Sequence, residues 1–147
     1  MSCYQHILLA VDFNESGSIV AKKAKQLAKE NQAHLSLIHV VDNPPVVDAG
    51  YGPIIPIGID FTEELMTSAK KRLAKLADKF EFKENKQWLE MGNPKLEIVR
   101  VAKENNVDLI IVGSHGKHGI ALILGSTANG VLHHAKCDVL AVRIHDD

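Results

Sequence analysis

Four glycines lie close together in the C-terminal third of the chain, in a setting that suits the binding of an anion. An apolar run, 109–112, leads directly into them, and they are Gly113, Gly116, Gly119 and Gly125. Glycine permits positive φ and close approach of the backbone to a ligand, so successive N–H groups can form an anion-binding concavity. The pattern predicts a strand that ends in a phosphate-binding glycine loop.

Ser126 and Thr127 follow the last of these glycines and are expected to begin a helix, with Ser126 as its N-cap. The N–H groups at a helix N-terminus and the positive end of its dipole stabilise a phosphate. Tight turns without a ligand are the alternative explanation of the glycines. The pattern is neither the GxxxxGK[ST] of a P-loop nor GxGxxG.

Several histidines lie in or near the same stretch. His115 and His118 have HxxH spacing, and His133 and His134 lie on the following helix. A structural metal needs about four converging ligands, and no cysteine or carboxylate joins these histidines, so no metal site is predicted. Contact of His115 or Lys117 with a phosphate is the functional alternative to simple exposure to solvent.

Composition limits the class of protein. A chain of 147 residues that is 46% hydrophobic and 5% aromatic predicts a single domain, 1–147, with a core of Val, Ile, Leu and Ala, as in a parallel sheet covered by helices. A formal net charge of −1 gives no reason to expect a nucleic-acid partner. Without a leader-like N-terminus or an apolar run of about 20 residues, we expect a cytoplasmic protein outside the membrane. Cys3 and Cys137 have no motif spacing and are expected to be reduced.

Hydrophobic periodicity predicts strands that alternate with helices. The apolar runs predict five strands, at 6–11, 34–41, 87–91, 108–112 and 138–144. Helical spacing predicts four helices, at 16–31, 60–79, from Pro94 to the Asn105-Asn106 stop, and from Ser126. An Asp60-x-x-Glu63 capping box is expected to open the second helix, and Asn93 as N-cap the third. The proline- and glycine-rich segment 42–59 is also apolar, which favours a segment that lies over a pocket or a partner subunit.

This alternation is typical of an open, mostly parallel, doubly wound α/β sheet. Such sheets bind ligands beyond the carboxyl ends of the strands, where the strand order reverses. If the first and fourth strands flank the reversal, Asp12 and the loop from Gly113 share one crevice. His39, near the end of the second strand, is expected to be a packed or capping histidine and not a ligand.

Taken together, five stretches of the chain resemble the universal stress protein family over nearly the full length. These stretches are HILLAVDF, LIHVVD, GNP, VDLIIVGSHG and GSTANGVLHHAKCDVLAV. The resemblance implies a five-stranded sheet of order 3-2-1-4-5 with helices on both faces. The family has nucleotide binders with Gly-x2-Gly-x9-Gly-Ser/Thr and members that lack these glycines and bind no ATP. This chain has the glycines, but eight residues separate Gly116 from Gly125 instead of nine.

The resemblance implies ATP or AMP as cofactor, with or without Mg²⁺. It places Asp12 at the nucleoside, the Val40 backbone at the adenine edge and the glycine loop at the ribose and phosphates. The implied binding residues are Ala10, Val11, Asp12, Val40, Val112, Gly113, His115, Gly116, Gly125, Ser126 and Thr127. The expected function is that of a nucleotide-binding stress-response regulator with an unidentified protein partner. The alternative is a dimeric interaction protein that binds no nucleotide.

Catalysis is not expected beyond a slow ATPase. Asp12 is the one carboxylate predicted at the pocket floor, and no residue is assigned as a dedicated base. An ATP pyrophosphatase or adenylating enzyme would need an SGGxDS-like loop after the first strand, and VDFNES lacks its paired glycines. The fifth strand is expected at a sheet edge, where pairing with a two-fold copy would give a homodimer.

Overall fold

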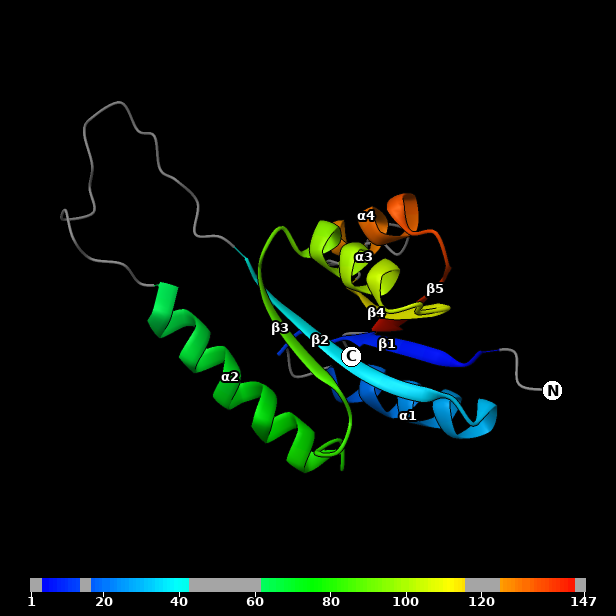
Figure 1. The fold of residues 1–147 in the computed structure, drawn as a ribbon, viewed down its shortest axis with the longest axis horizontal. Coiled ribbons are helices and arrows are strands. Elements are labelled where there is room, and N and C mark those ends of the chain that lie inside the picture. Colours follow the sequence, from blue (N-terminus) through cyan, green and yellow to red (C-terminus); the bar gives the residue numbers. More distant parts are fainter. Residues whose placement is uncertain (1–3, 14–16, 43–61, 116–124, 145–147) are drawn as a thin grey trace.

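The computed structural model describes residues 4–13, 17–42, 62–115 and 125–144, within which strands and helices alternate (Figure 1). In chain order the elements are β1 (His6–Ala10), α1 (Gly17–Asn31), β2 (His34–Asp42), α2 (Thr62–Lys79), β3 (Gln87–Gly92), α3 (Pro94–Glu104), β4 (Leu109–His115), α4 (Ser126–His134) and β5 (Asp138–Ile144). The expected capping residue Asp60 lies outside the described residues.

The strands form one parallel sheet in the order β3-β2-β1-β4-β5. The chain moves outward from β1 to β3 on one side and then returns to β4 on the other side of β1. The strand order therefore reverses between β1 and β4. This confirms the predicted doubly wound α/β fold and its strand order.

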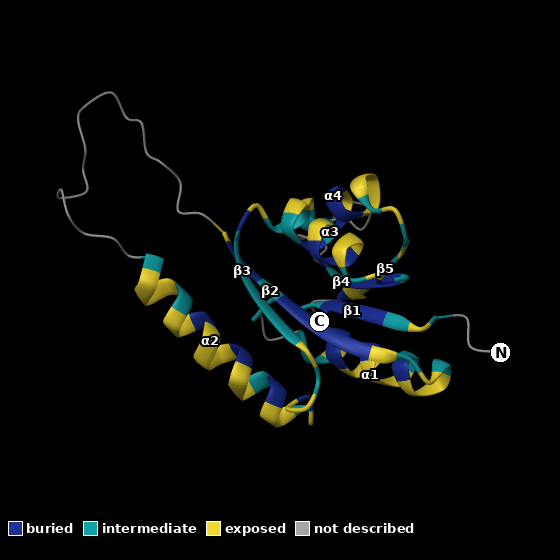
Figure 2. Ribbon diagram, in the orientation of Figure 1, coloured by how far each residue is buried: buried dark blue, intermediate teal, exposed yellow. Residues whose placement is uncertain are grey.

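Alternate side chains of each strand enter two separate cores, because strand residues point to opposite faces of the sheet. Ile7 and Leu9 lie in the core under α1 and α2, whereas Leu8 lies in the core under α3 and α4. Figure 1 shows the two pairs of helices on opposite faces of the sheet, and Figure 2 shows that the helices turn their buried stripes toward it. The near-continuous apolar strands follow from this burial on both faces.

Three helices end at the amino edge of the sheet with a residue in the left-handed conformation: Gln32 (φ 53°), Glu81 (φ 62°) and Asn106 (φ 55°). In each case the next N–H reaches back to a carbonyl five residues earlier, as in Ala33 N to Ala28 O (2.9 Å). Such bonds satisfy carbonyls at the helix end that have no partner within the helix. The expected role of the Asn105-Asn106 pair as a helix stop is confirmed.

The fourth strand is longer than predicted. It was expected to end at Val112, but β4 continues to His115 because Gly113, Ser114 and His115 pair with the end of β5. Asn93 is the N-cap of α3 and Pro94 begins the helix, as expected, although the Asn93 side chain makes no capping hydrogen bond.

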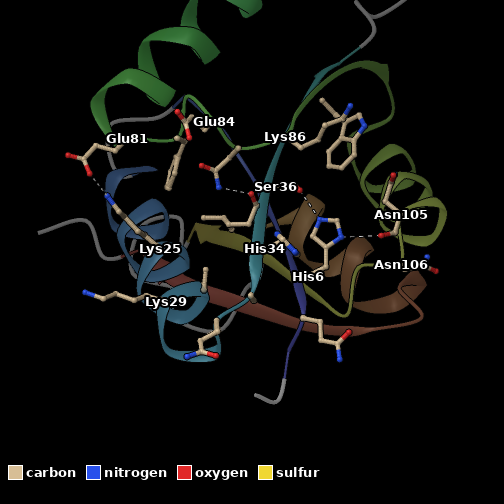
Figure 3. A pocket seen from close by; sticks show the side chains of 18 residues that line it. His6, Lys25, Lys29, His34, Ser36, Glu81, Glu84, Lys86, Asn105 and Asn106 are labelled. Atoms are coloured by element: carbon tan, nitrogen blue, oxygen red, sulfur yellow. Dashed lines mark hydrogen bonds and ion pairs between the residues drawn. The ribbon is translucent and has the colours of Figure 1, made fainter. Parts of the chain in front are cut away.

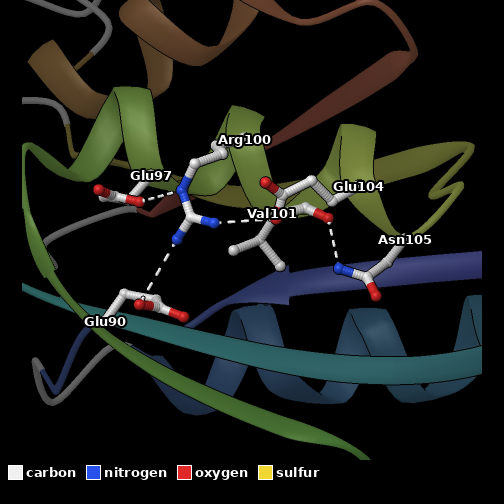
Figure 4. A network of polar contacts seen from close by, with 6 residues as sticks. All are labelled: Glu90, Glu97, Arg100, Val101, Glu104 and Asn105. Atoms are coloured by element: carbon white, nitrogen blue, oxygen red, sulfur yellow. Dashed lines mark hydrogen bonds and ion pairs between the residues drawn. The ribbon is translucent and has the colours of Figure 1, made fainter.

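An ion-pair network joins α3 to β3 (Figure 4). Arg100 contacts Glu97 at 2.6 Å and Glu104 at 2.9 Å along the helix, and Glu90 of β3 at 3.5 Å. The hydrogen bond that Arg100 donates to Glu97 is the main reason why the pKa of Arg100 is raised. Such exposed pairs orient side chains and contribute little to stability.

Candidate functional site at the carboxyl ends of β1, β2 and β4

The crevice predicted for Asp12 and Gly113 forms at the reversal in strand order. β1 ends at Ala10, so Val11 and Asp12 leave the sheet beside β4. Ala10, Val11, Asp12 and Gly113 line one small cavity of about 10 Å³, together with the first residue of α1, Gly17. A cavity of that volume has room for about one water molecule. A nucleotide would therefore lie over the strand ends and not inside this cavity.

Gly17 holds α1 close to Asp12. A Cβ at this position would lie 2.9 Å from the Asp12 carbonyl oxygen, which is nearer than side-chain carbons approach backbone. The N-terminus of α1 can reach the end of β1 only because the first helical residue has no side chain.

Gly113 is needed for a different reason from the one predicted. It was expected to supply positive φ in a loop, but it lies within β4, and Gly92 is the one glycine of the described residues with positive φ. A Cβ on Gly113 would meet Ile144 Cδ1 at 3.0 Å and Val20 Cγ2 at 3.2 Å. Close packing of α1 and β5 against β4 therefore requires a glycine here.

The backbone of Val40 points toward the same crevice. Ile38 O accepts a hydrogen bond from Val11 N at 2.8 Å, whereas Leu37 N donates to Lys86 O, next to β3. Because N–H and C=O directions alternate along a strand, the Val40 backbone faces the β1 side, as Ile38 does. β1 has ended at that level, so the Val40 peptide groups lie beyond its last residue at the carboxyl end of the sheet, although Val40 does not line the small cavity itself. The Val112 side chain is buried in the core beneath α3 and α4.

The helix that was expected to bind phosphate begins one residue earlier than predicted. Gly125, and not Ser126, is the N-cap of α4, and no side chain makes a capping hydrogen bond to the helix N-terminus. Ser126 cannot act as N-cap because it already has helical geometry, and the first helical bond runs from Asn129 N to Gly125 O (2.9 Å). The N–H groups of Ser126 and Thr127 consequently have no acceptor within the helix. Because α4 joins parallel neighbours β4 and β5, its N-terminus lies at the carboxyl end of β4.

Some of the predicted loop residues lie outside the described part of the chain. These are Gly116 and the eight residues that separate it from Gly125, His118 among them. His115 is the last residue of β4. The structure therefore brings together the strand-end residues Ala10 to Asp12, Val40 and Gly113, and leaves the predicted loop contacts as expectations.

Sequence reasoning missed a stack of side chains that holds the end of β1. The His39 ring donates from Nδ1 to Val11 O at 2.7 Å and packs on Phe13, with ring centroids 4.1 Å apart. The Arg72 guanidinium of α2 lies 4.5 Å from the Phe13 ring centroid, and its Nη2 contacts Phe13 O at 3.5 Å. An aromatic residue directly after Asp12, and a histidine directly before Val40, were the available signals.

Burial lowers the pKa of His39 below the usual histidine value of about 6.5. The hydrogen bond with the Val11 carbonyl and the charge of Asp12 oppose this effect, whereas the charge of Arg72 adds to it. A carbonyl can only accept, so Nδ1 must carry a proton. The expectation that His39 is a packed or capping histidine is confirmed.

A much larger cavity than this one lies at the opposite end of the sheet. It is an open groove of about 900 Å³ at the amino ends of the strands, where β1, β2 and the ends of α1 and α3 meet (Figure 3). None of the predicted binding residues lines it. The more spacious cavity is therefore not the one lined by the predicted binding residues. We place the candidate site at the carboxyl ends of the strands, where sheets of this topology bind ligands.

Metal and thiol chemistry find no support among the described residues. They contain no group of three or more His, Cys, Asp or Glu side chains that could hold a metal ion. Burial, followed by the charges of Asp138 and Asp108, raises the pKa of the Cys137 thiol. A thiol with a raised pKa is a poor nucleophile.

The fold and the candidate site define a parallel α/β protein with a crevice where the strand order reverses. The chain matches the model of the universal stress protein family over residues 3–143. It is 47% identical to universal stress protein A homolog 2 of Coxiella burnetii over 146 residues, 98% of either chain. Homolog 1 from the same organism is 37% identical over 139 residues, which are 95% of this chain and 96% of that one. This chain belongs to the universal stress protein family.

Solved structures agree with this assignment. Hypothetical protein MJ0577 superposes with a TM-score of 0.77 at 28% identity, covering 98% of this chain and 99% of that one. The universal stress protein UspA from Lactobacillus plantarum gives 0.70 at 26% identity, covering 95% and 98%. No helix among the described residues is both long and apolar enough to span a bilayer.

Proposed function

We propose that this chain is an adenine-nucleotide-binding regulator of the stress response, which takes AMP or ATP at the carboxyl ends of β1, β2 and β4. The observation that carries the proposal is the convergence of Asp12, the Val40 backbone and the N-terminus of α4 on one edge of the sheet. These groups differ in chemistry, and each suits a different part of a nucleotide.

Asp12 offers a carboxylate that accepts hydrogen bonds from ribose hydroxyls. The Val40 peptide offers a donor and an acceptor to the edge of a base. The N–H groups of Ser126 and Thr127, which have no acceptor within the helix, lie at the positive end of the α4 dipole and suit a phosphate. Gly113, Gly116 and Gly125 would complete the cradle, as the family motif implies.

Binding without rapid turnover fits this set of residues. Asp12 is the one carboxylate among the described residues that line the crevice. If Asp12 holds the ribose, it is not positioned as a base for water at a terminal phosphate. We therefore propose at most a slow ATPase, with Mg²⁺ bound through phosphate oxygens if at all.

The proposed assembly is a homodimer through β5. This strand pairs with β4 along one side, and its residues Val139, Leu140, Ala141 and Val142 are all partly exposed. An apolar edge strand invites pairing with another chain. β3, at the other edge, carries Gln87 and Glu90 and is less suited to such pairing.

Native mass spectrometry tests the proposal directly. Purified protein incubated with AMP should gain one nucleotide per chain, and Asp12→Ala should lose it, because the ribose hydroxyls lose their acceptor. Glu30→Ala, an exposed carboxylate of α1, is the matched control and should bind as the wild type does. Absence of any nucleotide adduct would place the protein in the branch of the family that binds none.

A further inference from the structure

We infer that His39 is a positioning residue that ends the pairing of β1 with β2 and thereby leaves the Val40 peptide free to read the edge of an adenine base. This inference deepens the proposed function, since it concerns base recognition at that same site. It begins from the hydrogen bonds at the end of β1.

The register of β1 and β2 would carry their pairing one step further than it goes. Ala10 is paired with Ile38, and Val11 N donates to Ile38 O at 2.8 Å. In a regular parallel ladder, the next bond would run from Val40 N to Val11 O. Among the described residues Val11 O accepts instead from the His39 ring, at 2.7 Å.

The imidazole thus takes the acceptor that the Val40 N–H would otherwise use. A buried carbonyl needs a partner, and the ring supplies one without lengthening the strand. The Val40 N–H and C=O, both directed to the β1 side, are left at the crevice.

Phe13 and Arg72 keep the ring in place. Phe13 stacks on His39 at a centroid distance of 4.1 Å, and the Arg72 guanidinium covers Phe13 at 4.5 Å. Arg72 belongs to α2, whereas His39 belongs to β2 and Phe13 follows β1. The geometry of the base site is therefore coupled to the position of α2.

The freed peptide selects adenine over guanine. Adenine presents an amino donor beside a ring-nitrogen acceptor, whereas guanine presents the O6 acceptor where adenine has its amino group. The Val40 carbonyl can accept from the adenine amino group and would repel guanine O6.

The test compares AMP and GMP affinities by calorimetry in His39→Leu, His39→Asn and the wild type. Leucine removes the donor to Val11 O, so the Val40 N–H is drawn into the ladder. AMP affinity should fall roughly tenfold, and the preference for AMP over GMP should fall with it. The asparagine amide can still donate to Val11 O and should restore both.

Two further variants sharpen the comparison. Arg72→Ala should weaken AMP binding by roughly threefold, because the stack loses its outer cation while the His39 donor remains. His34→Leu replaces an exposed histidine at the other end of β2 and should bind as the wild type does. An unchanged AMP-to-GMP ratio in His39→Leu, or equal losses in His39→Leu and His39→Asn, would overturn the inference.

Amide exchange in nucleotide-free protein separates this inference from the proposed function. The Val40 amide of the wild type should exchange faster than that of Val41, and it should slow in His39→Leu as it bonds to Val11 O. If the wild type bound neither AMP nor ATP, the proposed function would fail, and the exchange rates would still decide the role of His39. Slow exchange at Val40 in the wild type would refute it.

Discussion

A hydrogen bond between Ser36 and His6 joins β2 to β1 at the amino end of the sheet, and its removal should lower the stability measurably. Ser36 is 3% exposed, and its hydroxyl lies 2.7 Å from His6 Nε2. His6 Nδ1 lies 3.1 Å from Asn105 O, which can only accept, so a neutral His6 carries its proton on Nδ1 and Ser36 donates to Nε2 (Figure 3). The chain of bonds links β2, β1 and the end of α3.

Ser36→Ala removes the donor and leaves His6 Nε2 without a partner in a half-buried site. The unpaired acceptor should cost about 1–2 kcal/mol of the free energy of unfolding. In urea, with a slope of about 2 kcal/mol per molar, the midpoint should fall by roughly 0.5–1 M. Ser68→Ala on the exposed side of α2 is the control and should leave the midpoint unchanged.

The double variant Ser36→Ala/His6→Leu isolates the bond itself. Replacing both partners by apolar groups removes the unsatisfied acceptor, so the double variant should lose less than the sum of the single losses, by about 1 kcal/mol. Losses that add within about 0.3 kcal/mol would refute this account of the bond.

Three further predictions concern packing, assembly and pH. Gly130→Ala should lower stability by roughly 1 kcal/mol despite alanine's higher helix propensity, because a Cβ there would lie 2.8 Å from Lys95 Cβ of α3; a raised unfolding temperature would contradict this. Light scattering at micromolar concentration should give a dimer mass for the wild type and a monomer for Val142→Lys, whereas a dimeric variant would count against pairing through β5. His39 has a lowered pKa in the folded state, so the unfolded chain binds the proton more readily. Stability should therefore fall as the pH drops below about 6.5. This prediction fails if the unfolding free energies of wild type and His39→Asn differ by the same amount at every pH.

The fold could be predicted because local pattern and global topology agree in this chain. Apolar runs such as 34–41 are too short for helices and are flanked by helical periodicity, which leaves few arrangements other than a parallel sheet. The strand order came from the family resemblance. The end of β4 was misplaced because Gly113 looked like a loop residue, and only its pairing with Val142 shows that it belongs to the strand.

The site could be predicted only in part, because contacts between distant residues have no local pattern. Asp12 was found because it directly follows a buried strand in a fold that binds ligands there. The stacking of Arg72 over Phe13 joins positions 59 residues apart, and nothing in either neighbourhood signals the other. The role of His39 likewise depends on the register between β1 and β2.

Calorimetry that compares AMP with ATP tests the central claim most directly. The contacts from Asp12 and Val40 lie outside the shortened span between Gly116 and Gly125, so both nucleotides should bind. Their affinities should lie within a factor of about ten, or about 1.4 kcal/mol, because the additional phosphates gain little from the shorter loop. ATP binding that is tighter by more than this would show a full phosphate cradle, and no heat with either nucleotide would contradict the claim that this chain binds adenine nucleotides.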